Sequence, residues 1–102
     1  MSTLHTVNKS PFDRPSLQTC LRLAGKDHAV LLFEDGVYGA LQGSTVADTV
    51  KKALDTVSIY VLGADLKARG LSEDKLIDGI KIVDYKGFVE LTVENDKVNA
   101  WL

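Results

Sequence analysis

The most reactive side-chain atom in this chain is the sulfur of Cys20, the only cysteine among 102 residues. A thiolate is the best nucleophile that side chains offer near neutral pH, so Cys20 is the candidate catalytic residue. It could accept a sulfane sulfur as a persulfide and pass that sulfur to another thiol. Arg14, Arg22 and Lys26 are close in sequence, and the first turns of a helix favour a thiolate.

The alternative role for Cys20 is packing. Free cysteine is among the most buried residue types and often acts as a small hydrophobe. Cys20 shares a predicted helical face with Leu17, Leu21 and Ala24, because these positions recur at helical spacing. The sequence leaves both roles open.

Three aspartates, Asp35, Asp65 and Asp84, each follow a predicted strand. Ligand sites of parallel sheets lie at the carboxyl ends of strands, but aspartates there also close turns and cap helices. We expect turn chemistry to explain most of them, although a small-ligand site formed by these loops is a further hypothesis. His5 and His28 are far apart without a second cysteine nearby, so no metal site and no cofactor are predicted.

Several common binding motifs are missing from the sequence. It holds neither a Gly-x-Gly-x-x-Gly nor a Gly-x-x-x-x-Gly-Lys-Ser/Thr motif, which argues against dinucleotide and phosphate-loop sites. The lack of Cys-x-x-Cys excludes a dithiol cycle. The formal charge of −2 argues against direct binding to nucleic acid, which requires a basic footprint.

The strands that must position these residues are marked by apolar runs. Ala29–Phe33 and Val57–Leu62 lack polar alternation, which predicts central strands buried on both faces. Further strands are expected over Leu4–Val7, Ile80–Val83 and Asp96–Leu102. The longest apolar run is too short to cross a membrane, and with one cysteine and no signal-like start we expect a cytoplasmic setting.

Helical segments alternate with these strands. They are expected over Leu17–Ala24, with Gly25 in the left-handed position after the helix, and over Val46–Leu54, Asp65–Arg69 and Phe88–Glu94. This order predicts an α/β fold in a single domain, residues 1–102. Its five-stranded, mainly parallel sheet carries helices on both faces in a flavodoxin-like layering.

Four strings together resemble one known family. They are Leu-His-Thr at 4–6, Asp-Leu-x-Ala-Arg-Gly at 65–70, Asp-Tyr-x-x-Phe-Val at 84–89 and Ala-Trp at 100–101. In combination they resemble the DsrH/TusB family of sulfur-relay subunits, over nearly the whole chain. The resemblance implies a DsrEFH-like fold and a subunit of a sulfurtransferase complex.

The resemblance also implies partners. These are two homologous subunits, DsrE/TusD-like and DsrF/TusC-like, in a cytoplasmic hetero-hexamer where another subunit carries the principal sulfur-accepting cysteine. A small carrier protein of the DsrC/TusE type exchanges sulfur with that complex. No membrane and no direct nucleic-acid contact are expected.

Two branches of the family differ in the purpose of the sulfur. Members of the sulfur-oxidation branch typically carry a cysteine in the first helix, so Cys20 favours that branch. The alternatives are a TusB-type subunit for 2-thiolation of the tRNA wobble uridine, and a subunit that only builds the assembly. Trp101 near the carboxyl end either anchors an interface or packs under a helix.

Overall fold

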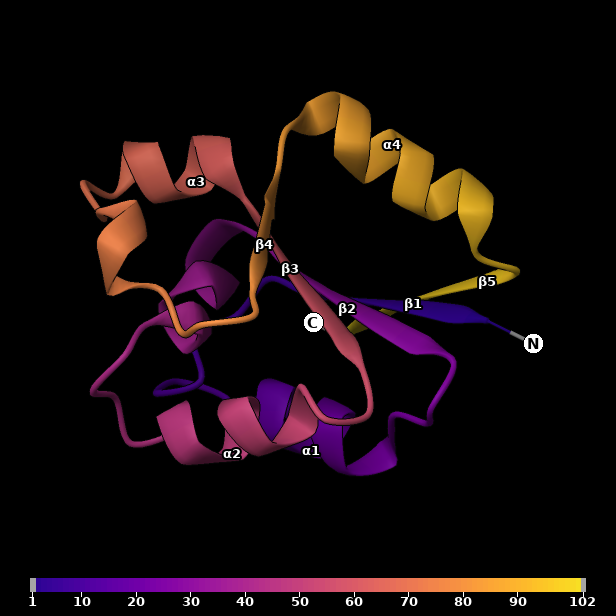
Figure 1. The fold of residues 1–102 in the computed structure, drawn as a ribbon, viewed down its shortest axis with the longest axis horizontal. Coiled ribbons are helices and arrows are strands. Elements are labelled where there is room, and N and C mark those ends of the chain that lie inside the picture. Colours follow the sequence, from indigo (N-terminus) through magenta and orange to yellow (C-terminus); the bar gives the residue numbers. More distant parts are fainter. Residues whose placement is uncertain (1, 102) are drawn as a thin grey trace.

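Five parallel strands form one sheet in the computed structural model, which describes residues 2–101 (Figure 1). The strands are β1 (Thr3–Val7), β2 (His28–Leu32), β3 (Ser58–Leu62), β4 (Lys81–Val83) and β5 (Lys97–Trp101). Their order is β4-β3-β2-β1-β5, and each neighbouring pair is parallel. The chain therefore adds strands in one direction and then crosses back to place β5 beside β1.

Helices cover both faces of this sheet, as the sequence predicts. The α-helices are α1 (Ser16–Leu23), α2 (Ala47–Ala53), α3 (Gly63–Ala68) and α4 (Tyr85–Glu94), and the 3-10 helices are η1 (Glu34–Ala40) and η2 (Glu73–Lys75). Figure 1 shows α1 and α2 on one side of the sheet and α4 on the other. The short helix α3 follows directly from the carboxyl end of β3.

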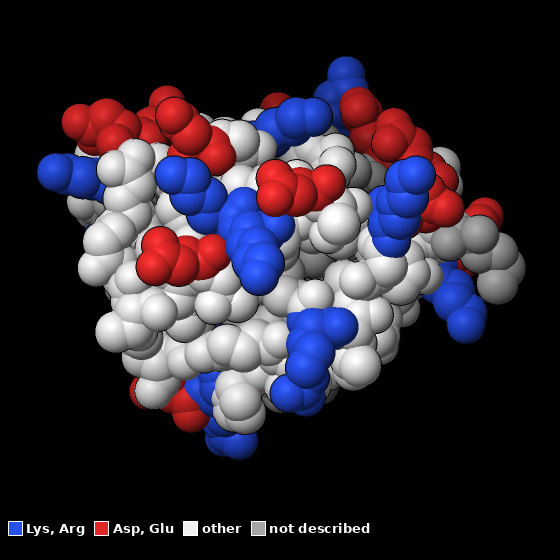
Figure 2. All heavy atoms as spheres, turned by 60° about the horizontal axis from the view of Figure 1, so that its bottom comes forward, with Lys and Arg blue, Asp and Glu red and all other residues white. Residues whose placement is uncertain are grey.

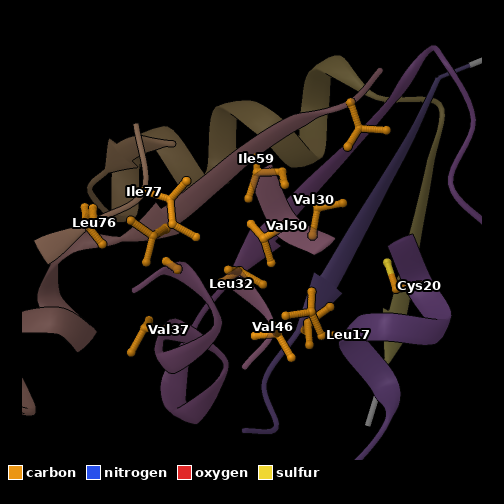
Figure 3. Close-up of a cluster of buried hydrophobic side chains, with 14 of the residues drawn as sticks. Leu17, Cys20, Val30, Leu32, Val37, Val46, Val50, Ile59, Leu76 and Ile77 are labelled. Carbon is orange, nitrogen blue, oxygen red and sulfur yellow. The ribbon is translucent and has the colours of Figure 1, made fainter. Parts of the chain in front are cut away.

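The sheet divides the apolar core into two clusters. The larger cluster joins α1, α2 and η1 to the strands and includes Leu17, Val30, Leu32 and Ile59 (Figure 3). The smaller one, on the α4 side, is built on Leu4, Leu31 and Leu91. Strand β2 contributes buried residues to both clusters, which confirms the prediction that this apolar run is covered on both faces.

The predicted left-handed glycine after the first helix is wrong. Helix α1 ends at Leu23, the next residue Ala24 is extended with φ −69° and ψ 134°, and Gly25 has no positive φ. A left-handed glycine occurs instead after α3, where Gly70 has φ 66°. The glycine therefore correctly predicts where the helix ends, but not the backbone conformation that ends it.

Helix α4 also starts earlier than the sequence predicts. The helix begins at Tyr85 rather than at Phe88, because Asp84 acts as its N-cap and accepts a hydrogen bond of 2.8 Å from the amide of Gly87. This bond satisfies one of the free amides of the first turn. The β-branched residues further along the helix have lower helix propensity, so the sequence gives only a weak signal for where the helix begins.

Candidate functional site

Cys20 lies in the middle of α1 and points into the larger core cluster, on the same helix as Leu17 (Figure 3). Its relative exposure is 0%. Burial raises the pKa of the Cys20 thiol to about 12, because the charged thiolate would lose its hydration. At neutral pH the sulfur is therefore a protonated thiol without access to a donor, and the expected lowering of its pKa by the helix is not seen.

The aspartates that follow β2 and β3 meet at the carboxyl edge of the sheet. The backbone amide of Glu34 donates to Oδ2 of Asp65 at 2.7 Å, and Nε of Arg69 donates to Oδ1 of Asp35 at 3.0 Å. A terminal guanidinium nitrogen of Arg69 lies 3.8 Å from Oδ1 of Asp65. These contacts tie the start of η1 to α3.

This carboxyl-edge network has a structural task. Glu34 adopts a left-handed φ of 48°, an unusual conformation for a residue with a side chain, and the bond from its amide to Asp65 holds it there. Gly36 follows closely against β1, where an added Cβ would lie 2.2 Å from the carbonyl oxygen of Val7. The two carboxylates thus close a tight turn, as turn chemistry predicts, and Asp84 caps α4.

A hollow of about 630 Å³ lies between the ends of β3 and β4 and the start of α4. Its lining includes Gly63, Lys67, Glu73, Asp84 and Tyr85. One carboxylate oxygen of Asp84 is already engaged in capping α4. Within residues 2–101 no cluster of three or more histidine, cysteine or acidic side chains could hold a metal ion.

A third polar cluster joins residues that the sequence did not connect. The indole Nε1 of Trp101 lies 3.0 Å from Nδ1 of His5, and Nε2 of His5 lies 2.8 Å from Nδ1 of His28. His5 is buried, and both burial and the nearby His28 lower its pKa. Trp101 is half-buried and packs against the larger core cluster.

Part of the solvent-facing surface of α4 is apolar. Tyr85, Val89 and Val93 are spaced by four residues and are 64%, 59% and 78% exposed. The same helix buries Leu91 against the sheet. Helix α4 therefore presents apolar side chains on two faces, and we call Tyr85, Val89 and Val93 the α4 stripe. Contiguous exposed apolar surface of this kind marks contact sites for other proteins.

Charged side chains are mixed rather than segregated. Figure 2 shows basic and acidic residues interspersed over the face that it presents. In the part of the chain that the structure describes, no helix has the length and apolar character needed to span a bilayer. The longest of the described helices, α4, has 10 residues.

The sequence profile of a family described as "DsrH like protein" matches residues 9–98. Curated relatives carry the name "Protein TusB". One from Pectobacterium parmentieri is 38% identical over 99 residues, covering 96% of this chain and 99% of the relative. Others from Erwinia tasmaniensis and Escherichia coli are 41% and 35% identical, with the same coverage.

Solved structures share the fold over nearly the full length. The ychN protein from Escherichia coli superposes with a TM-score of 0.82 at 25% identity, covering 98% of this chain and 99% of the other. A protein of unknown function from Methanobacterium thermoautotrophicum superposes with a TM-score of 0.78 at 17% identity, covering 97% of each chain. The second likeness bears on the fold alone.

Proposed function

Because the chain belongs to the DsrH/TusB family, we propose that it is a TusB-type subunit of a sulfur-relay complex that serves 2-thiolation of the tRNA wobble uridine. In this proposal the chain shapes the assembly, while the thiol of a homologous subunit accepts the sulfur. The observation that carries it is the complete burial of the sole cysteine in a chain whose relatives are named TusB.

The choice between thiolation and sulfur oxidation depends on Cys20. Its position in the first helix was the one reason to favour sulfur oxidation. The thiol lies in the core, so its presence is accounted for by packing and needs no role in transfer. The similarity to relatives named TusB supports the thiolation branch instead.

The buried sulfur also weighs against a carrier role for this subunit. A persulfide carrier must meet its donor and acceptor thiols at a surface, and its attacking form is the thiolate. Cys20 meets neither condition in this conformation, since it is fully buried and its pKa is raised to about 12. A transfer step through Cys20 would first require α1 to leave the sheet.

Two features of the surface support a role in assembly. The α4 stripe exposes three large apolar side chains, and both edge strands, β4 and β5, are mostly exposed. Open sheet edges and exposed apolar stripes are usually covered by a partner. We propose that the two homologous subunits of a hetero-hexamer cover them, and that a TusE-type carrier protein docks on the complex rather than on this chain alone.

Complementation tests the proposed function. The chain is expressed with its two partner subunits in a bacterial strain that lacks its own three genes, and 2-thiouridine is measured in the digested tRNA. We expect the wild-type chain and Cys20→Ala to restore thiolation equally. If the complex forms but the wild-type chain restores none, the thiolation branch is wrong.

The same complex identifies the sulfur-carrying subunit. It is exposed to a sulfane-sulfur donor, and each subunit is weighed by mass spectrometry. We expect the mass of one added sulfur atom on a partner subunit and none on this chain. An added sulfur on Cys20, combined with lost thiolation in Cys20→Ala while the complex still assembles, would instead establish Cys20 as a carrier.

A further inference from the structure

A chain of two hydrogen bonds connects three strands near one edge of the sheet. Trp101 on β5 is hydrogen-bonded to His5 on β1 at 3.0 Å, and His5 is hydrogen-bonded to His28 at the start of β2 at 2.8 Å. The ring centroids of His5 and Trp101 are 6.1 Å apart, and those of His5 and His28 are 4.9 Å apart. These contacts join residues that are distant in sequence, and they cross the last two strand pairings of the sheet.

The chemistry of the indole fixes where the protons lie. An indole N–H can only donate, so Nδ1 of His5 must offer a lone pair to Trp101. The neutral ring of His5 then carries its proton on Nε2 and donates it to Nδ1 of His28. That nitrogen must also hold a lone pair, and the proton of His28 lies on Nε2. Both bonds therefore exist together only when both imidazoles are neutral.

Protonation of either ring removes one of these bonds. A second proton on His5 would place an N–H against the indole N–H, and a second proton on His28 would place an N–H against that of His5. We propose that His5, His28 and Trp101 form an acid-sensitive clamp that holds the carboxyl end of β5 on the sheet and releases it when His5 gains a second proton. This proposal does not depend on the function proposed above.

The clamp matters because β5 has few other attachments. It is an edge strand that pairs only with β1, and residues 97–100 are exposed. Its beginning is held by hydrogen bonds between Ser2 and Asp96, both 3.2 Å long. Its end is held by Trp101, whose ring packs against the core and whose indole N–H reaches His5. Loss of the clamp therefore frees one end of the strand.

The surrounding groups bear on the same equilibrium. The hollow beside the two histidines is lined by Lys97 from β5, and Lys26 and Asp27 lie in the turn before β2. Cys20 on α1 is an uncharged thiol. Lys97 and a histidine cation repel each other, whereas Asp27 attracts one. Burial and His28 lower the pKa of His5 below its ordinary value of 6.5, which agrees with a neutral ring in the closed clamp.

The direction of the pH effect follows from this lowered pKa. In the released form His5 binds a proton more readily than in the closed form, so acid favours release. The clamp is fully effective above pH 6.5, the ordinary value, and weakens as the pH falls from there toward the lowered pKa of His5 in the fold. Each pH unit in that window can multiply the population of the released form by at most about tenfold, because release is linked to the uptake of one proton.

Hydrogen exchange of the full chain tests the clamp. Trp101 is the only tryptophan, so its indole N–H gives a single signal, and the amides of residues 97–101 report on β5. Protection factors, corrected for the intrinsic pH dependence of exchange, are measured from about pH 7.5 to about pH 5.5. We expect the protection of the indole and of β5 to fall below pH 6.5, by at most about tenfold per pH unit, while the amides of β2 stay protected.

Glutamine variants separate the clamp from other effects of acid. In His5→Gln the amide can still accept at its oxygen and donate at its nitrogen, but it cannot gain a proton. The pair His5→Gln with His28→Gln should lose the acid response of β5. Trp101→Phe should leave β5 poorly protected at every pH, without further loss in acid. The proposal would be overturned if the protection of β5 in the wild-type chain does not change with pH. It would also be overturned if the double variant or Trp101→Phe keeps the wild-type acid response.

Discussion

The two faces of the sheet differ in how completely they are covered. On one face α1, α2 and η1 enclose a continuous core, and Leu17 is 1% exposed. On the other face α4 contributes Leu91 to a small cluster, and its outer residue Val93 is 78% exposed. The first face has the packing of a finished domain interior, whereas the second leaves apolar surface that another chain can cover.

This difference separates stability from assembly. Cys20 belongs to the enclosed face, where a side chain contributes by filling space. The α4 stripe belongs to the open face, where a side chain contributes little to folding because it is already in water. Substitutions on the two faces should therefore fail in different assays.

The largest effect on stability is expected at the centre of the enclosed face. Leu32→Ala removes a fully buried side chain from β2 and should lower the free energy of unfolding by about 2–5 kcal/mol. Urea denaturation followed by circular dichroism measures this loss. The control Val89→Ala on the α4 stripe should change stability by no more than about 0.5 kcal/mol. Equal losses in the two variants would contradict the comparison of the faces.

The largest effect on assembly is expected at the α4 stripe. Lysine at positions 89 and 93 suits a helix better than valine, and the lysine at position 93 places positive charge in the last turn. Val89→Lys with Val93→Lys should keep the stability of the chain but abolish co-purification with the two partner subunits. The α4 stripe supplies the apolar contact that two charges would remove.

A matched control exists on the other face. Leu23 ends α1 and is 62% exposed, so Leu23→Lys adds charge to an equally accessible site. This variant should still co-purify with the partners. If Leu23→Lys breaks the complex while the double variant at α4 does not, the assembly surface lies on the α1 side.

A smaller effect is expected at Cys20. Cys20→Ala removes one small buried group and should cost about 1 kcal/mol of unfolding free energy. Cys20→Ser should lower the free energy of unfolding further, by about 1–3 kcal/mol, because it buries a hydroxyl in an apolar core. The same denaturation assay measures both.

Alkylation of the folded chain provides an independent check. A thiol with a raised pKa in a closed core should react with iodoacetamide only as the chain unfolds, at every pH up to about 9. Rapid labelling of the native chain near neutral pH would show that the sulfur is accessible, and it would support a role of Cys20 as a sulfur carrier.

Much of the fold was predictable because it depends on local patterns. The apolar runs at 29–33 and 57–62 identify strands that need cover on both faces, and the alternation with helices fixes a parallel sheet. The α4 stripe follows from the four-residue spacing of Tyr85, Val89 and Val93, but the β-branched valines leave the start of the helix unclear in the sequence. The cap at Asp84 resolves that ambiguity.

The polar cluster of His5, His28 and Trp101 could not be predicted in the same way. Its members lie on three strands, and whether they meet depends on strand order and register. The placement of β5 beside β1 after a crossover is a property of the whole chain. The sequence indicates the two roles open to Cys20, but only the packing of α1 in the larger core cluster reveals its burial.

The smallest effect is expected at the carboxyl-edge network, which lies between the two faces. Arg69→Ala removes the ion pair with Asp35, whose side chain is 59% exposed, and should cost less than about 1 kcal/mol. The loss should shrink as salt is raised, because ions screen exposed charges. Denaturation of Arg69→Ala, Asp35→Ala and the double variant in low and high salt gives the coupling between the two residues. We expect that coupling to stay below about 1 kcal/mol. A salt-independent coupling of about 2 kcal/mol or more would show that this turn, and not only the enclosed face, stabilises the chain.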